Sequence, residues 1–286
     1  MKKIRTFFFS MLPCLLGIIL QFLLSFSLML LSAGFVFLTM PNNSSDDKWN
    51  RLMELWGNTN FNTIIMMLFS VSCIIVFGFW YRKTFEKDFQ LKSKKKFHLL
   101  QIIGIIFLVP ATQFMSAILV NILSTFFPSW LISYETLLEN AGLTEDISII
   151  MMIYSVCLAP ISEELIFRGV TMRITRKCFP FWIANIMQAL FFGIFHMNIL
   201  QGCYAFALGL FLGYVCERGE SIYHAILFHF LFNLWGTTVS EWLTNLNPAF
   251  TGIFVCFSTT IGMGVGLKLF HAGTKQLLCT EEYNIT

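Results

Sequence analysis

Charged residues are scarce in this sequence. Asp, Glu, Lys and Arg together make up 12% of the 286 residues, against about 25% in soluble globular domains. Hydrophobic residues reach 56%, with 33 phenylalanines, and the mean hydropathy is +0.71. This composition excludes an ordinary soluble domain and predicts an integral membrane protein.

Cysteine motifs and zinc-peptidase motifs are lacking as well. The eight cysteines include no C-x-x-C pair, and most of them fall inside apolar runs, where cysteine behaves as a small hydrophobic residue. The sequence also contains no H-E-x-x-H helix motif, the signature of many zinc peptidases. We therefore expect neither a disulfide framework nor a thiolate metal centre.

Apolar runs long enough to span a membrane, at about 17 to 25 residues each, occur eight times. They lie near residues 11–38, 61–81, 99–127, 149–174, 181–198, 202–217, 221–239 and 249–269. We predict an all-α, polytopic membrane helix bundle of about eight transmembrane helices with a polar site inside the membrane. Residues 1–146 would form the first three helices, 147–240 a core of four helices, and 241–286 the last helix and a tail.

Lys and Arg collect in every second loop. They occur at the N-terminus, between Arg82 and Lys96, from Arg173 to Lys177, at Arg218 and in the C-terminal tail, whereas the alternate loops are acidic or neutral. Because positive loops stay in the cytoplasm, we predict that both termini are cytoplasmic.

The cluster Lys92–Lys96 is typical of a segment that meets anionic lipid, so we expect the lipid bilayer and no nucleic acid as a partner. The Phe-, Ile- and Lys-rich composition favours a bacterial plasma membrane.

Glu163, Glu164 and Arg168 interrupt the fourth apolar run. A carboxylate near the bilayer centre costs at least about 2.5 kcal/mol and is by default functional. Glu164 and Arg168 are four residues apart and share a helix face, so we predict a structural charge pair. Glu163 is rotated from Glu164 by about 100° around the helix and is the carboxylate left to face water.

Two later runs also carry costly polar groups. His196 lies in the fifth run, and His229 and Asn233 lie four residues apart on one face of the seventh. With a helix rise of about 1.5 Å per residue, Glu163, His196 and His229 come to similar depths when measured from the basic ends of their helices. We predict that these side chains form one site below the cytoplasmic face, opening to the cytoplasm. His224 is rotated away and is left out of this site.

Three short motifs follow one another on separate predicted helices. They are Glu-Glu-x-x-x-Arg at 163–168, Phe-x-x-x-His at 192–196 and His-x-x-x-Asn at 229–233. In this order they resemble the CPBP family, which contains CAAX prenyl endopeptidases and the bacteriocin-processing or immunity relatives also called Abi proteins. The resemblance covers residues 147–240, and each motif alone is weak.

The resemblance implies a glutamate-dependent intramembrane endopeptidase. Glu163 and His196 would position and deprotonate a water, and His229 and Asn233 would stabilise the oxyanion, without a cofactor. Peptide hydrolysis does need a base near its water and donors that face the developing oxyanion. The substrate would be a peptide or a membrane protein; the sequence does not define the oligomeric state.

Three alternatives stay open. Glu163, His196 and His229 match the ligand count of a catalytic Zn²⁺ site, although their spacing does not favour one. A resemblance to the immunity branch allows a non-proteolytic protein that binds a peptide toxin or its receptor. Buried Glu and His also occur in transporters, but the two halves of the sequence show no repeat with broken helices.

Overall fold

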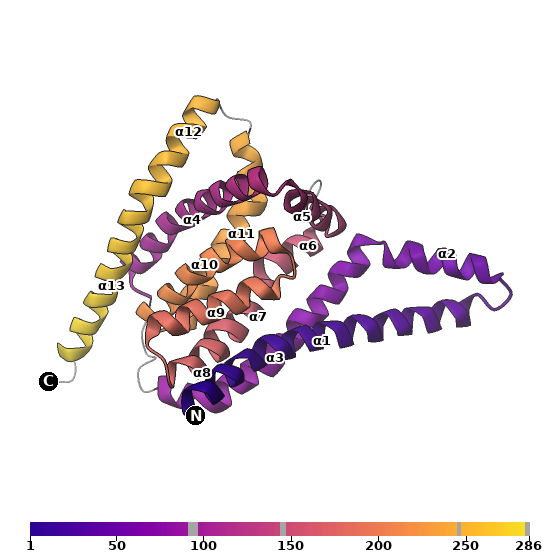
Figure 1. Ribbon diagram of the computed structural model, residues 1–286, viewed down its shortest axis with the longest axis horizontal. Coiled ribbons are helices and arrows are strands. Elements are labelled where there is room, and N and C mark those ends of the chain that lie inside the picture. The colour runs from indigo at the N-terminus through magenta and orange to yellow at the C-terminus, as the bar shows by residue number, and fades with distance from the viewer. Residues whose placement is uncertain (91–96, 144–146, 245–246, 284–286) are drawn as a thin grey trace.

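The structure, a computed structural model, describes residues 1–90, 97–143, 147–244 and 247–283. Within these ranges every regular element is a helix, which confirms the predicted all-α class (Figure 1). The predicted lipid-facing cluster Lys92–Lys96 lies outside the described residues. The helices are α1 (Lys2–Thr39), α2 (Ser45–Trp56), α3 (Thr59–Gln90), α4 (Leu99–Phe126), α5 (Pro128–Asn140), α6 (Ile149–Ile153), η1 (Tyr154–Leu158), α7 (Ala159–Glu164), η2 (Leu165–Thr171), α8 (Met172–Arg176), α9 (Phe181–Phe195), α10 (Ile199–Arg218), α11 (Ile222–Thr244), α12 (Pro248–Phe257), η3 (Ser258–Gly262) and α13 (Met263–Tyr283).

Six helical segments among the described residues are long and apolar enough to cross a membrane. They are Lys2–Thr39, Thr59–Phe85, Leu99–Phe126, Ile149–Arg176, Ile199–Arg218 and Phe250–Leu277. The protein is therefore an integral, multi-pass membrane protein, as predicted. The predicted count of eight is not confirmed, because α9 has only 15 residues and α11 is not among the six.

Two helices lie where the sequence predicted loops. α2 begins at a capping box, in which Ser44 and Asp47 satisfy each other's backbone N–H groups. α5 begins with Pro128 at its first turn, where the missing N–H of proline costs no helical hydrogen bond. Both helices are too short to span a bilayer, so they add to the surface at one end of the bundle rather than to the number of spans.

The basic segments gather at one end of the bundle, which we call the basic end. Thr6 Oγ1 lies 3.1 Å from Cys178 Sγ, so the N-terminus of α1 meets the turn after α8. Arg176 pairs with Glu217 at the end of α10 at 2.9 Å, and Lys177 lies 4.9 Å from the centre of the Phe85 ring of α3. In Figure 1 both chain termini and α8 lie low in the view, while α2, α5, α6 and α12 lie higher.

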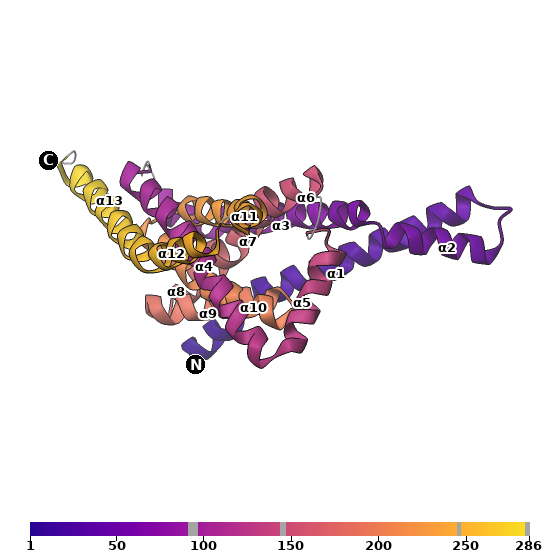
Figure 2. The ribbon, with the colours of Figure 1, turned by 90° about the horizontal axis from the view of Figure 1, so that it is seen from above.

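Close helix packing fixes the centre of the bundle. A Cβ added to Gly193 of α9 would meet the carbonyl oxygen of Gly202 of α10 at 2.6 Å, so the two backbones touch in a way that only small residues permit in a membrane. Phe167 and Phe192 pack edge to face beside this crossing. In Figure 2 the central helices α7 to α11 lie between α13 on one side and the projecting α2 on the other.

Candidate active site

The two adjacent glutamates lie on the central helix between two π-helical turns. η1 ends before Pro160, and η2 begins directly after Glu164. Proline lacks an N–H, and its ring clashes with the carbonyl four residues earlier in a regular helix. The wide turn of η1 accommodates that clash, and such π-turns inside α-helices are frequent at functional sites.

Glu164 is fully buried and forms the centre of an ionic network. Arg168 Nη1 donates to Glu164 Oε1 at 2.8 Å, and both side chains are 0% exposed. His229 Nδ1 lies 2.9 Å from the same oxygen. Because a carboxylate that binds a guanidinium is ionised and only accepts, Nδ1 of His229 carries the proton. The charge pair expected from the spacing is thus present, and Glu164 also orients the imidazole of His229, a contact that the sequence did not predict.

Arg168 is held in place by more than its glutamate. Its Nη2 donates to the carbonyl oxygen of Gly209 at 3.2 Å, and its guanidinium carbon lies 4.5 Å from the centre of the Phe192 ring. The positive charge is therefore fixed between α9 and α10 by a hydrogen bond and a cation–π contact. Within this network Glu164 and Arg168 neutralise each other.

Glu163, by contrast, faces an open space. Its side chain is 16% exposed, and its Oε2 lies 3.8 Å from His229 Nε2, beyond hydrogen-bond distance. His229 therefore lies between the two carboxylates, bonded to Glu164 through Nδ1 and directed at Glu163 through Nε2. A water molecule or a substrate oxygen near Glu163 is within the reach of both groups.

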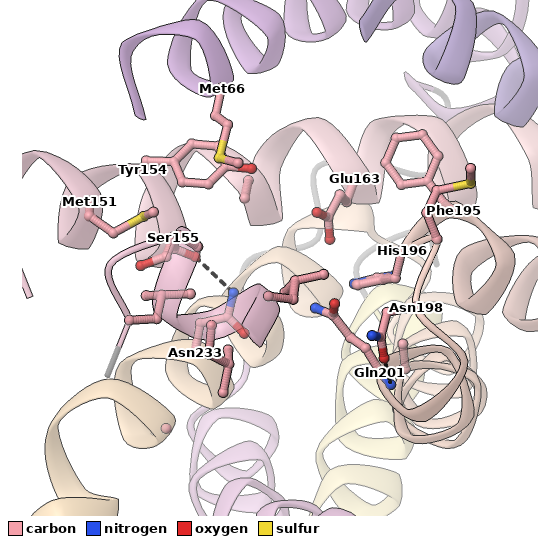
Figure 3. A pocket seen from close by; sticks show the side chains of 18 of the residues that line it. Met66, Met151, Tyr154, Ser155, Glu163, Phe195, His196, Asn198, Gln201 and Asn233 are labelled. Atoms are coloured by element: carbon pink, nitrogen blue, oxygen red, sulfur yellow. Dashed lines mark hydrogen bonds between the residues drawn. The ribbon is translucent and has the colours of Figure 1, made fainter. Parts of the chain in front are cut away.

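His196 enters the same space from the end of α9. Its Nδ1 lies 2.8 Å from the carbonyl oxygen of Phe192, and a carbonyl can only accept, so Nδ1 donates. In a neutral imidazole this leaves Nε2 as an acceptor. Figure 3 shows Glu163 and His196 directed into one cavity from different helices.

Asn233 lines the cavity but is also engaged in a structural contact. Its Nδ2 donates to the carbonyl oxygen of Ser155, in η1, at 2.8 Å (Figure 3). An amide nitrogen has two N–H groups, so one of them stays available for an oxyanion.

His224 is bonded to Gln101 at the basic end and does not line the cavity, in agreement with its exclusion.

The cavity has a volume of about 1160 Å³, enough for several residues of a peptide. Its wall includes polar groups that the sequence analysis missed, among them Tyr154 and Ser155 on η1 and the hydrogen-bonded pair Tyr134 and Tyr204 at 3.1 Å. Tyr154 and Ser155 lie in the fourth apolar run and Tyr204 in the sixth, whereas Tyr134 lies in the segment between the third and fourth runs, where no pattern pointed to a site. Their convergence depends on how the helices pack.

The cavity extends away from the basic end. On the central helix it is lined by residues that precede Glu164 and by none of η2 or α8, and on α10 it is lined only by the half nearest Ile199. Ser133, Thr136 and Asn140 of α5 are both exposed and part of its wall. The expectation that the site opens toward the basic loops is therefore wrong. Helix rise gave the depth of Glu163, which lies near the middle of its helix, but not the direction of the opening.

Residues 145–235 match the family model of Rce1-like type II CAAX prenyl endopeptidases. This match confirms the resemblance found in the sequence. It covers about a third of the chain and contains all six candidate residues, from Glu163 to Asn233. Searches among curated proteins and solved structures gave no match. At the level of the family, the Rce1-like region indicates a CAAX-protease-like intramembrane protease that acts on a peptide or protein in the lipid bilayer.

The two histidines that line the cavity use their Nδ1 atoms for protein contacts. His229 binds Glu164, and His196 binds the Phe192 carbonyl, so each presents only Nε2 to the cavity. Among the described residues, no three His, Cys, Asp or Glu side chains are grouped as metal ligands. Histidines that bind a metal also donate their second ring N–H to a carboxylate or a carbonyl oxygen, so the orientation of His196 and His229 beside Glu163 fits a water, an oxyanion or a metal ion.

Proposed function

We propose that this protein is an intramembrane endopeptidase that hydrolyses a peptide bond with a water activated by Glu163, without a metal. The observation that carries the proposal is the placement of Glu163, His196 and His229 around one cavity within the bundle, next to a buried pair that is neutral overall. A free carboxylate beside two oriented imidazoles provides a base and a donor at one point.

The proposed reaction begins with a water held between Glu163 and the Nε2 atom of His196. Glu163 accepts a proton from this water as its oxygen attacks the carbonyl carbon of the scissile peptide bond. The tetrahedral oxyanion accepts a hydrogen bond from Nε2–H of His229. Because Nδ1 of His229 already donates to Glu164, Nε2 carries a proton only when both ring nitrogens are protonated, so this step requires the imidazolium form. Glu163 then returns the proton to the leaving amine as the C–N bond breaks.

Asn233 is the second proposed oxyanion donor. One of its N–H groups holds the Ser155 carbonyl, and this contact fixes the amide plane, so the other N–H has a defined direction. A preorganised donor of this kind stabilises the transition state more than a mobile one. The ionic network behind it keeps Glu164 and Arg168 out of the reaction itself.

We place the protein in a bacterial plasma membrane with both termini in the cytoplasm, as the loop charges predict. The substrate is a membrane-associated peptide or a segment of a membrane protein, and no nucleic acid takes part.

The test is quantitative peptidomics of membranes that contain the wild type or Glu163→Gln. We expect a set of fragments that disappears in Glu163→Gln and persists in Glu217→Gln, a matched change at the exposed ion pair of the basic end. Identical fragments in all three membranes would contradict the proposal. The cavity would then bind peptides without cleaving them, as in the immunity alternative.

A further inference from the structure

The tyrosines in the cavity wall differ in what their hydroxyl groups bind. Tyr134 and Tyr204 bind each other at 3.1 Å. The hydroxyl of Tyr154, which also lines the cavity, forms a hydrogen bond with no described residue. Tyrosine hydroxyls inside proteins usually find a partner. The Tyr154 hydroxyl is therefore available to a molecule that enters the cavity.

The π-helical turn η1 is the reason why Tyr154 faces the same cavity as Glu163. The two residues are nine positions apart, and nine residues of regular α-helix, at about 100° each, place two side chains on opposite sides. η1 begins at Tyr154 and adds a residue to its turn, which shifts the side chains before it by about 100° around the helix. Both residues line the cavity for this reason.

The same turn connects Tyr154 to the amide of Asn233. Asn233 Nδ2 donates to the carbonyl oxygen of Ser155, the next residue after Tyr154, at 2.8 Å. Figure 3 shows Tyr154, Ser155 and Asn233 on one side of the open space and Glu163 and His196 on the other, with the Tyr154 hydroxyl directed toward Glu163. Glu163 and Tyr154 also interact electrostatically. A group held between the two sides can contact both the base and the phenol.

We propose that Tyr154 is a further catalytic residue, whose hydroxyl donates a hydrogen bond to the carbonyl oxygen of the scissile peptide bond. The attacking water comes from the side of Glu163 and His196, so the carbonyl oxygen is left on the side of Tyr154 and Asn233. The hydrogen bond strengthens as this oxygen becomes the oxyanion. The inference rests on the proposed function, to which it adds a third donor beside His229 and Asn233.

A phenol suits this task because it donates without a charge. An ordinary phenol has a pKa of about 10 and keeps its proton at neutral pH. Nε2 of His229, by contrast, donates only when its imidazole is doubly protonated. The Tyr154 hydroxyl supplies a donor that does not depend on that proton. It gives up no proton in the reaction, so Glu163 stays the only base and acid of the mechanism.

Tyr154→Phe tests the proposal, because it removes the hydroxyl and keeps the ring. The matched control is Tyr223→Phe, the same change at a tyrosine that is 63% exposed and does not line the cavity. Purified full-length proteins are assayed in detergent on a substrate found by the peptidome comparison. We expect kcat of Tyr154→Phe to fall by about 10- to 100-fold with KM near the wild-type value, and no change in the control. An unchanged kcat, or a rise in KM alone, would overturn the proposal.

The pH dependence of kcat separates a donor to the substrate from a residue that acts through Glu163. Between about pH 6 and 8 a phenol stays protonated, so Tyr154→Phe should lower the whole profile by one factor without moving it along the pH axis. A displaced profile would mean that the hydroxyl changes the ionisation of Glu163, and would overturn its contact with the substrate. Thermal unfolding should show little change, because no described residue loses a hydrogen bond.

Fluorine NMR tests the placement of the hydroxyl without any cleavage. With 3-fluorotyrosine at position 154, the ¹⁹F signal should shift in Glu163→Gln and stay in place in Glu217→Gln, a change at the distant ion pair of the basic end. A signal that is the same in both variants would overturn the placement of Tyr154 beside Glu163.

The two proposals give different results when they fail. If fragments disappear in Glu163→Gln but form at the wild-type rate in Tyr154→Phe, the endopeptidase assignment stands and the third donor is refuted. If no fragment depends on Glu163, the endopeptidase assignment fails, and the catalytic function of Tyr154 fails with it even where the ¹⁹F signal shifts as expected.

Discussion

Glu163 and Glu164 are neighbours in the sequence, yet their surroundings are opposite. Glu164 is 0% exposed and bound by Arg168 and His229 through one oxygen, whereas Glu163 is 16% exposed and borders the cavity. Because helix geometry rotates adjacent side chains by about 100°, one helix supplies both a buried, paired charge and a carboxylate that faces the cavity. The comparison teaches that the motif places two carboxylates in different surroundings, and the function proposed for each can be tested alone.

The largest expected effect is that of Glu163→Gln on turnover. The amide keeps the size of the side chain but cannot accept the proton of water, so kcat should fall by about two to four orders of magnitude. Folded yield and thermal stability in detergent should stay close to the wild type, because the 3.8 Å contact between Glu163 Oε2 and His229 Nε2 is too long for a hydrogen bond. If Glu163→Gln kept normal turnover while a well-folded Glu164→Gln protein were inactive, the general base would have to be Glu164 instead of Glu163.

The next effect is the loss of stability in Glu164→Gln or Arg168→Ala. Removal of one partner of a buried ion pair leaves an uncompensated charge, at a cost of about 3 to 5 kcal/mol. Thermal unfolding in detergent measures this loss. The double change Glu164→Gln with Arg168→Met removes both charges and should recover part of the stability; no recovery would mean that the pair is not the reason for the loss.

Glu164 also has a testable effect on His229. In Glu164→Gln the amide oxygen still accepts from Nδ1 of His229, but the negative charge beside the ring is gone. In any folded fraction, kcat should therefore fall while KM stays near the wild-type value, since the imidazolium is needed only as the oxyanion forms. An unchanged kcat per folded molecule would show that His229 acts in its neutral form.

The sequence was sufficient for some of these features and not for others. The fold class, most helix positions and the Glu164–Arg168 pair follow from hydropathy and from the four-residue helical repeat. The contact of Glu164 with His229 joins α7 and α11, and no periodicity within one helix can reveal it. The direction of the cavity was beyond reach for the same reason: Phe167 and Phe228 close one end only because their helices meet there.

A smaller effect is expected for Asn233→Ala, which tests whether this site has a second donor. Loss of an oxyanion donor lowers kcat by about two to three orders of magnitude, and the unpaired Ser155 carbonyl costs about 1 to 3 kcal/mol of stability. Asn233→Asp also removes both N–H groups but keeps the size of the side chain, so it is the control for the lost volume in Asn233→Ala. If Asn233→Ala loses stability but keeps kcat, Asn233 only supports the π-helical turn of η1.

The smallest expected effect is that of metal removal. In the proposed mechanism Glu163 acts as a base and requires no ion, so dialysis against a strong chelator should leave kcat unchanged. Elemental analysis should then find well under one zinc per chain, and added zinc should not raise activity. The opposite result, one zinc per chain whose removal abolishes turnover, would make Glu163 a ligand together with His196 and His229. Glu163→Gln would in that case also lose the bound zinc, whereas Glu164→Gln would keep it in any folded fraction, so the zinc content of these two variants decides between a base and a ligand independently of the activity assay.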